Sequence, residues 1–247
     1  MDAERKLKDA KELAEKSDKL KTEFLAQMSH EIRTPINSIV SFTQLIREQL
    51  EDKSDEDLQT AFNSIENSSN RVIRTGDLIL NMSKIQTGTH EYNPINLCLC
   101  KDVFHEFETQ YRRLADQKKI DFEIVCSTKN SEVFADQYSL IQIFINILDN
   151  AFKYTEKGLI KIDFEDSDNG SISVKISDSG IGIDEQFLPN LFSPFIQEEQ
   201  GYSRKYEGNG LGLALVKKYC DLNNAQINVT SKKGEGSVFE VLLNKAG

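Results

Sequence analysis

Several features that mark large classes of protein are missing from this chain. Its 247 residues include no tryptophan, and histidine and cysteine are scarce, with three and four residues respectively. No run of about 18 apolar residues is present, as a membrane-spanning helix would need, and the N-terminus does not resemble an export signal. The net charge of −10 disfavours binding to nucleic acid or to an anionic membrane. We therefore predict a cytoplasmic segment with no nucleic-acid partner and no direct membrane contact.

The cysteines do not form a recognisable metal or disulfide pattern. Cys98 and Cys100 would share one face of a strand, while Cys126 and Cys220 lie far away in the sequence. No histidine or cysteine pair completes a zinc set. We expect free thiols.

The first residues have a coiled-coil pattern. Residues 1–23 carry seven acidic and seven basic side chains, above a seam of apolar residues in steps of three and four. We expect residues 1–22 to form a coiled-coil or signal helix. The helix begins without a cap, which suggests a missing upstream sensor domain, through which the full-length protein could be membrane-anchored.

Residues 23–91 are expected to form a helical hairpin. The apolar seam continues to Leu50, the polar run 51–57 indicates a turn, and a second amphipathic helix ends near Gly88. Two long amphipathic helices cannot bury their apolar stripes alone. Pairing of two copies into a four-helix bundle solves this, so we predict a homodimer.

His30 lies on the first helix of this hairpin. Met28 and Ile32 are each two positions away, or about 200° around the helix. If they face a core, His30 faces water beside Glu31. An exposed imidazole next to a carboxylate is a candidate nucleophile, although a surface histidine without a function fits the same pattern.

Residues 92–247 change to a mixed pattern of strands and helices. We predict strands at 95–99, 120–126, 132–135, 158–165, 171–178, 225–231 and 237–243, and helices at 101–118, 137–153, 184–190 and 210–223. This pattern indicates an α/β sandwich with one mixed sheet under a layer of helices.

Three segments of this second domain suit a nucleotide. Asn146, Asn150 and Lys153 share one face of the helix at 137–153 and offer a carbonyl oxygen to Mg²⁺ and a cation to phosphates. Asp178 ends a strand at a glycine turn, where its carboxylate can accept the adenine amine. Residues 208–212 have the spacing G-x-G-x-G before a helix N-terminus, which suits phosphate oxygens but matches neither the Rossmann fingerprint nor the P-loop.

Taken in order, these motifs resemble the catalytic core of a two-component sensor histidine kinase. The resemblance rests on FLAQMSHEIRTP (24–35) as the H-box, NILDNAFKYT (146–155) as the N-box, DSGIGI (178–183) as the G1-box, LFSPF (191–195) as the F-box and GNGLGL (208–213) as the G2-box. It implies an α plus α/β protein, in which a dimerisation and phosphotransfer hairpin precedes an ATP-binding sandwich of the Bergerat (gyrase and Hsp90) type.

The family also implies roles for individual residues. His30 would be the phosphoacceptor, Glu31 the base that polarises it, and Thr34 a residue that orients water in a phosphatase reaction. Asn150 would bind Mg²⁺ and Asp178 the adenine. The full nucleotide set implied is Asn146, Asn150, Lys153, Tyr154, Asp178, Gly180, Gly182, Ile183, Phe195, Arg204, Gly208, Gly210, Leu211, Gly212 and Leu213, with Arg204 in a lid at 196–207 and Asn146 also among the catalytic residues.

The expected activity is autophosphorylation of His30 with ATP and Mg²⁺, followed by transfer to an aspartate of a response-regulator receiver domain. Two alternatives stay open. One is an ATP-hydrolysing clamp, although such relatives have a glutamate where this chain has Asn146. The other is a catalytically idle dimer that receives phosphate or docks a partner.

Overall fold

A computed structural model describes residues 25, 28–30, 32–48, 50, 56–128, 130–167, 170–198 and 209–246. The predicted coiled coil at 1–22 and the predicted site residues Glu31, Arg204 and Gly208 lie outside the described residues. The chain divides into two compact units, Met1–His90 and Glu91–Gly247. In the described part, no helix is both long enough and apolar enough to cross a membrane.

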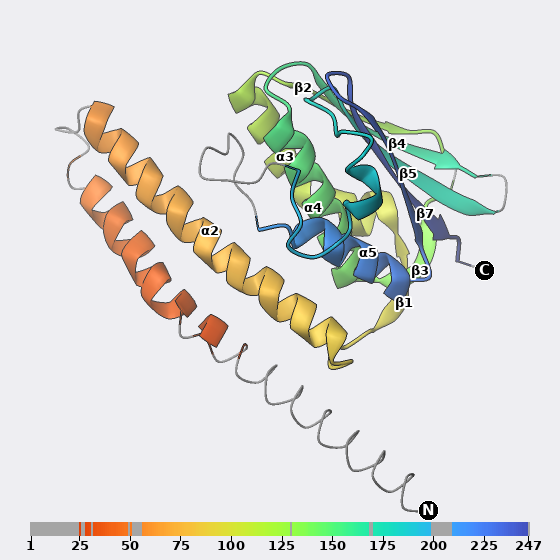
Figure 1. The fold of residues 1–247 in the computed structure, drawn as a ribbon, viewed down its shortest axis with the longest axis horizontal. Coiled ribbons are helices and arrows are strands. Elements are labelled where there is room, and N and C mark those ends of the chain that lie inside the picture. The colour runs from red at the N-terminus through yellow and green to blue at the C-terminus, as the bar shows by residue number, and fades with distance from the viewer. Residues whose placement is uncertain are drawn as a thin grey trace, which may run out of the picture. The chain divides into compact units, whose positions relative to one another are not determined.

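The first unit contains a helical hairpin. Residues 32–48 are helical, and helix α2 spans Glu56–Gln86 (Figure 1). Most of the turn predicted at 51–57 lies outside the described residues. The two helices are antiparallel, because Arg47 near the turn pairs with Glu66 (3.4 Å), whereas Arg33 pairs with Asp77 further along α2. The hairpin expected from the sequence is therefore confirmed.

The hairpin buries only part of its apolar surface. Thr43, Phe62, Leu78 and Met82 are buried. In contrast, Phe42 is 64% exposed, and it belongs to a larger exposed apolar set that we call the apolar stripe: Ile32, Ile39, Phe42, Leu45, Ile46, Ile65 and Val72. A single hairpin thus leaves the uncovered surface that the sequence analysis anticipated.

The second unit is built on a five-stranded sheet. Its strand order is β2-β4-β5-β7-β6, with β2 and β4 parallel and the other neighbours antiparallel. The bounds are β2 Asp121–Cys126, β4 Leu159–Asp166, β5 Ser171–Asp178, β6 Gln226–Lys232 and β7 Gly236–Asn244.

A separate antiparallel pair, β1 (Pro94–Cys98) and β3 (Glu132–Asp136), forms a second sheet. The prediction of one mixed sheet was wrong at this point. Strand β3 has five residues, all of them paired with β1, and the chain passes directly from it into helix α4. In the described part, β3 joins the larger sheet only by the bridge between Val133 and Lys245.

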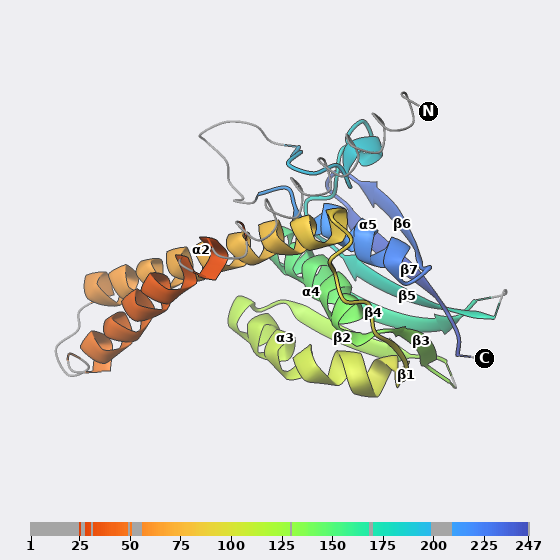
Figure 2. The same ribbon diagram turned by 90° about the horizontal axis from the view of Figure 1, so that it is seen from below.

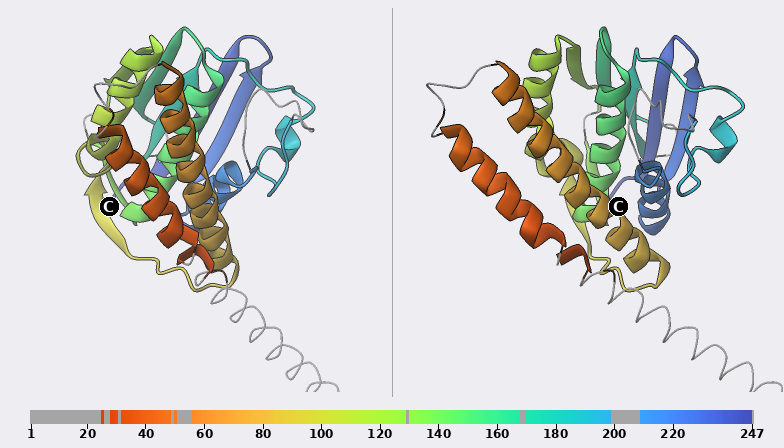
Figure 3. Two further views of the ribbon diagram at one scale, coloured as in Figure 1. Left: turned by 90° about the vertical axis from the view of Figure 1, so that its left-hand side faces the viewer. Right: turned by 60° about the vertical axis from the view of Figure 1, so that its left-hand side comes forward.

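Three α-helices cover one face of the larger sheet, as Figures 1 to 3 show. They are α3 (His105–Lys118), α4 (Gln137–Tyr154) and α5 (Gly212–Leu222). A π-helical segment, η1 (Leu99–Phe104), leads into α3. Phe104 at its end packs 4.6 Å from the ring of Phe144 on α4 and 4.7 Å from that of Phe164 on β4. These three rings therefore pack together in the core between the helices and the sheet.

Two predicted helix boundaries needed correction. The helix expected at 184–190 is a 3-10 turn, η2 (Leu188–Asn190), because Asp184 Oδ1 accepts the Gln186 N–H (2.8 Å) in a local turn. Helix α5 begins at Gly212 rather than 210, since Gly210 has φ +69°, which a right-handed helix excludes.

Asp136 connects three parts of this unit. Its Oδ1 accepts the Ser139 N–H (2.8 Å) and caps α4, and its Oδ2 accepts the Asn93 N–H (3.2 Å) from the segment before β1. Its own N–H donates to Asn223 Oδ1 (2.8 Å) at the C-cap of α5. One buried carboxylate residue therefore links the beginning of the domain to two helices of its helical layer.

Candidate functional site

His30 is exposed on the hairpin, between residues that are anchored to α2. Ser29 is buried, and its Oγ would lie 3.3 Å from a Cβ placed on Gly76. Arg33 forms an ion pair with Asp77, the next residue of α2. The helix face that carries Ser29 and Arg33 is thus fixed, while His30 points to solvent. The predicted exposure of His30 is confirmed, whereas Ile32, expected to face a core, is 44% exposed in the single hairpin.

Thr34 lies one turn after His30 and is also exposed. Its Oγ1 donates to the His30 backbone carbonyl (3.1 Å), as threonine commonly does within a helix. The two side chains therefore belong to one exposed helix surface, on which both would be accessible to a partner or to water.

Helix α4 carries the first part of the candidate nucleotide site. Asn146 is buried; its Nδ2 donates to the Gln142 carbonyl (2.8 Å), and its Oδ1 would lie 3.0 Å from a Cβ on Gly212. Asn150 follows one turn later and is half-buried. The amide of Asn146 therefore supports the beginning of α5, and Asn150 is the more accessible of the two.

Lys153 and Tyr154 end helix α4. Lys153 Nζ donates to Tyr154 Oη (2.9 Å) and lies 4.6 Å from the centre of that ring. The cation is held by this contact within the last turn of the helix.

Asp178 ends strand β5 beside the end of α4. Its Oδ1 accepts the Gly180 N–H (2.9 Å). Burial raises the pKa of this carboxyl, while hydrogen bonds from Gly180 and Ser237 act in the opposite direction. A partly buried carboxylate of this kind is a strong acceptor for an amine N–H.

The glycine turn after Asp178 fits closely against α4. A Cβ on Gly180 would lie 2.5 Å from the Tyr154 carbonyl oxygen, and the Ile181 N–H donates to the same oxygen (3.2 Å). Only glycine leaves room for this approach. The turn and the end of α4 are therefore held together by backbone contacts.

Strand β6 supports the other side of this turn. Gly182 has φ +63°, and a Cβ there would lie 2.0 Å from the Lys232 carbonyl oxygen. The Ile183 N–H donates to Ser231 Oγ (2.8 Å). Ser231 also donates to the Gly236 carbonyl (2.8 Å). The predicted residues Gly182 and Ile183 are thus fixed from β6.

The segment before α5 is joined to residues 191–195. The Phe195 N–H donates to the Gly210 carbonyl (3.0 Å), and Phe195 is 71% exposed with φ +64°. The Leu211 side chain is buried in the core, with 1% exposed, so only its backbone can face a ligand. Leu213 is half-buried.

Among the described residues, no side chain caps the N-terminus of α5. Its N-cap is Leu211, with no side-chain hydrogen bond to the first turn. Backbone N–H groups in the first turn of a helix lack intrahelical partners and attract anions. This end of α5 adjoins Asn146 through Gly212, so an anion-binding helix end lies beside α4.

The structure brings most of the predicted nucleotide residues into one contact network. Contacts join Tyr154 to Gly180, Asn146 to Gly212 and Phe195 to Gly210. Sequence reasoning missed the residues that support the Asp178 end, because Ser231, Gly236 and Ser237 come from β6 and β7. Gly236 fits closely here, since a Cβ would lie 1.9 Å from the Asp178 carbonyl oxygen. The sequence shows it only as a glycine of a hairpin junction, which gives no sign of this contact.

The fold and this network define a nucleotide-binding ATPase-type domain attached to a helical hairpin with an exposed histidine. Family models agree: residues 135–247 match the histidine kinase-, DNA gyrase B- and HSP90-like ATPase, and residues 20–88 match the His Kinase A (phospho-acceptor) domain. The chain belongs to the histidine kinases, as a phospho-acceptor domain followed by an ATPase-type catalytic domain.

Individual relatives agree with this assignment. The chain is 36% identical to the autoinducer 2 sensor kinase/phosphatase LuxQ of Vibrio parahaemolyticus over 98% of its own length and 29% of the relative. It therefore spans less than a third of that protein.

Two solved structures share the architecture. Full-length ShkA in complex with AMPPNP has a TM-score of 0.71 at 22% identity, covering 91% of this chain and 46% of ShkA; this likeness concerns the fold alone. The histidine kinase ThkA in complex with the response regulator TrrA has a TM-score of 0.58 at 26% identity, covering 91% of this chain and 61% of ThkA.

Proposed function

We propose that this chain transfers the γ-phosphoryl group of ATP to His30. The observation that carries the proposal is the exposed imidazole on a helix anchored at Ser29 and Arg33, joined in one chain to an ATPase-type domain. LuxQ is named a sensor kinase, which supports the same activity here.

The nucleotide is proposed to bind along the contact network of the second unit. The adenine amine would donate to Asp178, whose carboxylate is fixed by the Gly180 N–H. The phosphates would lie at the N-terminus of α5 and near Lys153. Support comes from the match of residues 135–247 to the histidine kinase-, DNA gyrase B- and HSP90-like ATPase family.

Asn150 is proposed as the protein ligand of Mg²⁺. In the described part of the chain, no group of three or more His, Cys, Asp or Glu residues could hold a metal. Magnesium in ATP-dependent enzymes commonly takes one or two protein oxygens and completes its shell with phosphates and water, so a half-buried amide fits. When bound, the ion neutralises negative charge on the β- and γ-phosphates.

The transfer itself needs an uncharged imidazole nitrogen in line with the γ-phosphorus. A nitrogen–phosphorus bond forms, the bond from the γ-phosphorus to the bridging oxygen breaks, and ADP leaves. Glu31, the residue next to His30 in sequence, is proposed to hold the other ring N–H. The contacts of the buried Ser29 and of Arg33 with α2 limit the movement of the acceptor helix, which favours a fixed attack geometry.

Partner proposals follow from the hairpin. The apolar stripe suits a second copy of the chain, which would complete a four-helix bundle. The phosphoryl group is proposed to pass to an aspartate on the receiver domain of a response regulator; ThkA, crystallised with the response regulator TrrA, supports this. Thr34 would allow a phosphatase reaction as well, and LuxQ is named a kinase/phosphatase. A sensor domain in a longer, membrane-anchored protein would supply the stimulus to a cytoplasmic core.

The ATPase alternative is disfavoured by Asn146. Its amide group is neutral and contacts the Gln142 carbonyl and the backbone at Gly212. An amide cannot accept a proton from an attacking water as a carboxylate does. Phosphoryl transfer to the protein therefore agrees better with the structure than hydrolysis does.

The test is labelling with ATP that carries a radioactive γ-phosphate. We expect acid-labile label on the wild type, none on His30→Gln, and normal label on His105→Gln, a control at another exposed histidine. Label that persists on His30→Gln would overturn the proposal, as would release of all the label as free phosphate. Mixing His30→Gln with Asn150→Asp would show whether one chain phosphorylates its partner.

A further inference from the structure

Two thiols from distant segments meet at one end of the second unit. Cys100 lies in η1 and Cys126 is the last residue of β2. Their sulfur atoms are 3.4 Å apart, which is about contact distance. The sequence analysis placed Cys100 with Cys98 on a strand face; in the structure Cys98 ends β1 and its sulfur lies 3.1 Å from Ser131 Oγ. All four cysteines are free.

The backbone on both sides of this pair is held by the core. Leu99, Val103 and Phe104 of η1 are buried, and Cys126 is opposite Phe164 in the register of β2 with β4. The Phe104 ring packs edge-on against the Phe164 ring at 4.7 Å. Because the same core fixes both segments, the two sulfur atoms can join by small side-chain rotations.

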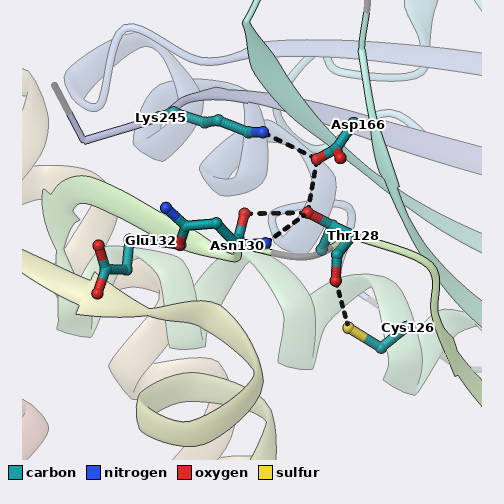
Figure 4. Close-up of polar contacts among 6 residues, drawn as sticks. All are labelled: Cys126, Thr128, Asn130, Glu132, Asp166 and Lys245. Carbon is teal, nitrogen blue, oxygen red and sulfur yellow. Dashed lines mark hydrogen bonds and ion pairs between the residues drawn. The ribbon is translucent and has the colours of Figure 1, made fainter.

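The two thiols differ in their surroundings. Cys126 is exposed, and its thiol faces the Thr128 carbonyl oxygen at 3.8 Å, as Figure 4 shows. Cys100 is less accessible, and burial raises the pKa of its thiol to about 11. Cys126 is therefore the thiol more accessible to reagents from solvent, and the sulfur of Cys100 lies 3.4 Å from it.

The Thr128 segment is itself held in place. Thr128 Oγ1 donates to Asp166 Oδ1 (2.5 Å), and Lys245 Nζ binds the same oxygen (2.9 Å) (Figure 4). The chain that follows Cys126 is thus tied to the end of β4 and to the segment after β7, which keeps the exposed thiol next to Cys100.

From this geometry we propose that Cys100 and Cys126 are an oxidisable dithiol, which a peroxide converts to a reversible disulfide. The proposal is independent of the kinase activity proposed above. In a reducing compartment, the disulfides that proteins do form are usually transient and reversible, as this one would be.

The reaction balances with one peroxide. The Cys126 thiolate attacks hydrogen peroxide, so that a sulfur–oxygen bond forms, the oxygen–oxygen bond breaks and one water leaves after protonation. Cys100 sulfur then attacks the sulfenic sulfur; the sulfur–sulfur bond forms, the sulfur–oxygen bond breaks, and the Cys100 proton leaves with the oxygen as the second water. Two thiols are oxidised to one disulfide and the peroxide is reduced to two waters.

The disulfide would join η1 to the edge strand β2 without touching the nucleotide residues. Cys126 is opposite Phe164, whereas Asp178 is opposite Ile160, four residues earlier on β4. This separation is about 13 Å along the strand. Oxidation would therefore stiffen the beginning of the domain, where the chain enters from residues 91–93, and leave nucleotide binding intact.

The experiment treats the reduced full chain with hydrogen peroxide, unfolds it in urea, blocks the remaining thiols with N-ethylmaleimide and measures intact mass and cross-linked peptides. We expect two of the four thiols to escape alkylation, a peptide linking Cys100 to Cys126, and return of both thiols after dithiothreitol. Cys98→Ser should retain this product, and Cys126→Ser and Cys100→Ser should both lose it. ATP affinity of the oxidised chain should equal that of the reduced chain.

Several results would overturn the proposal. One is a linkage between Cys98 and Cys100 in the wild type. Another is alkylation of all four thiols after peroxide treatment, and a third is Cys126 oxidised to sulfinic acid with no cross-link. Cys220 gives an internal reference, because burial raises the pKa of its thiol to about 12 and it should not react with peroxide in the folded protein.

Discussion

Asp178→Asn should separate nucleotide binding from stability, because the two effects have opposite signs. The wild-type carboxylate is held where burial raises its pKa, so its charged form is disfavoured when no ligand is bound. Asparagine keeps an oxygen that can accept the Gly180 N–H, which is 2.9 Å from Asp178 Oδ1, and removes the charge. The variant without nucleotide should therefore be more stable at pH 7.5.

The magnitudes can be bounded. A hydrogen bond to a charged group is worth about 1.5–3 kcal/mol, so loss of the carboxylate acceptor should weaken ATP binding roughly 10- to 150-fold. The gain in stability is smaller than the loss of binding energy. In the wild type, hydrogen bonds from Ser237 lower the pKa of the carboxyl against the effect of burial, and an amide accepts these bonds less well. A net gain of about 1 kcal/mol would raise Tm by roughly 2–4 °C in a domain of this size.

The pH dependence gives a further check. A carboxyl with a raised pKa in the folded state destabilises the fold only while it is charged, so the penalty is present above the folded pKa and vanishes below the unfolded value of 3.8. The Tm difference between variant and wild type should thus shrink as pH falls from 7.5 towards 4. Asp184→Asn, an exposed carboxylate nearby, is the control and should change neither property.

The assays are titration calorimetry with Mg-ATP and thermal unfolding without nucleotide. An Asp178→Asn chain that binds ATP like the wild type would refute the role of Asp178. A variant that loses binding and stability together would refute the reasoning about burial, because the carboxylate would then be a net support of the fold.

Two further changes test other contacts. Gly210→Ala should lower Tm and weaken ATP binding, because Gly210 has φ +69° and a Cβ would lie 2.8 Å from the Phe195 backbone; a cost of about 1–3 kcal/mol is expected, and unchanged calorimetric binding would contradict it. Ser173→Ala removes the 2.7 Å bond to Glu240 that, as the largest cause, lowers the pKa of that carboxyl. The stability it supplies is present above the unfolded value of 4.5 and lost as pH falls, so the variant should be about 0.5–1.5 kcal/mol less stable at pH 7 and match the wild type near pH 3; a deficit independent of pH in urea unfolding would argue against the role of Glu240.

Local sequence patterns predicted the elements of the second unit well. Strand β5 lies at residues 171–178 as expected, and α4 extends one residue past the predicted 153. These segments have strong apolar periodicity and clear turn residues, so short-range physics determines them. The order of five motifs then predicted both the hairpin and the ATPase-type sandwich.

Long-range packing could not be read in the same way. That β1 and β3 form their own sheet depends on where β3 enters α4, and the pairing of Cys100 with Cys126 depends on how η1 packs on the sheet. Ser231 and Ser237 support the candidate site from β6 and β7. The alternation of apolar and polar residues locates these two strands in the sequence, but it does not show which residues the serines contact. Contacts between residues distant in sequence decided each of these features.

The carboxylate of Asp136 has a mechanical consequence. A displacement of the chain at Asn93 strains a bond to the same group that caps α4, and the Asp136 N–H carries that strain to Asn223 at the far end of α5. Tension applied where the chain enters this unit would thus be shared between the helix that bears Asn150 and the helix that begins at Gly212. One residue, through its carboxylate and its backbone N–H, therefore holds both helices.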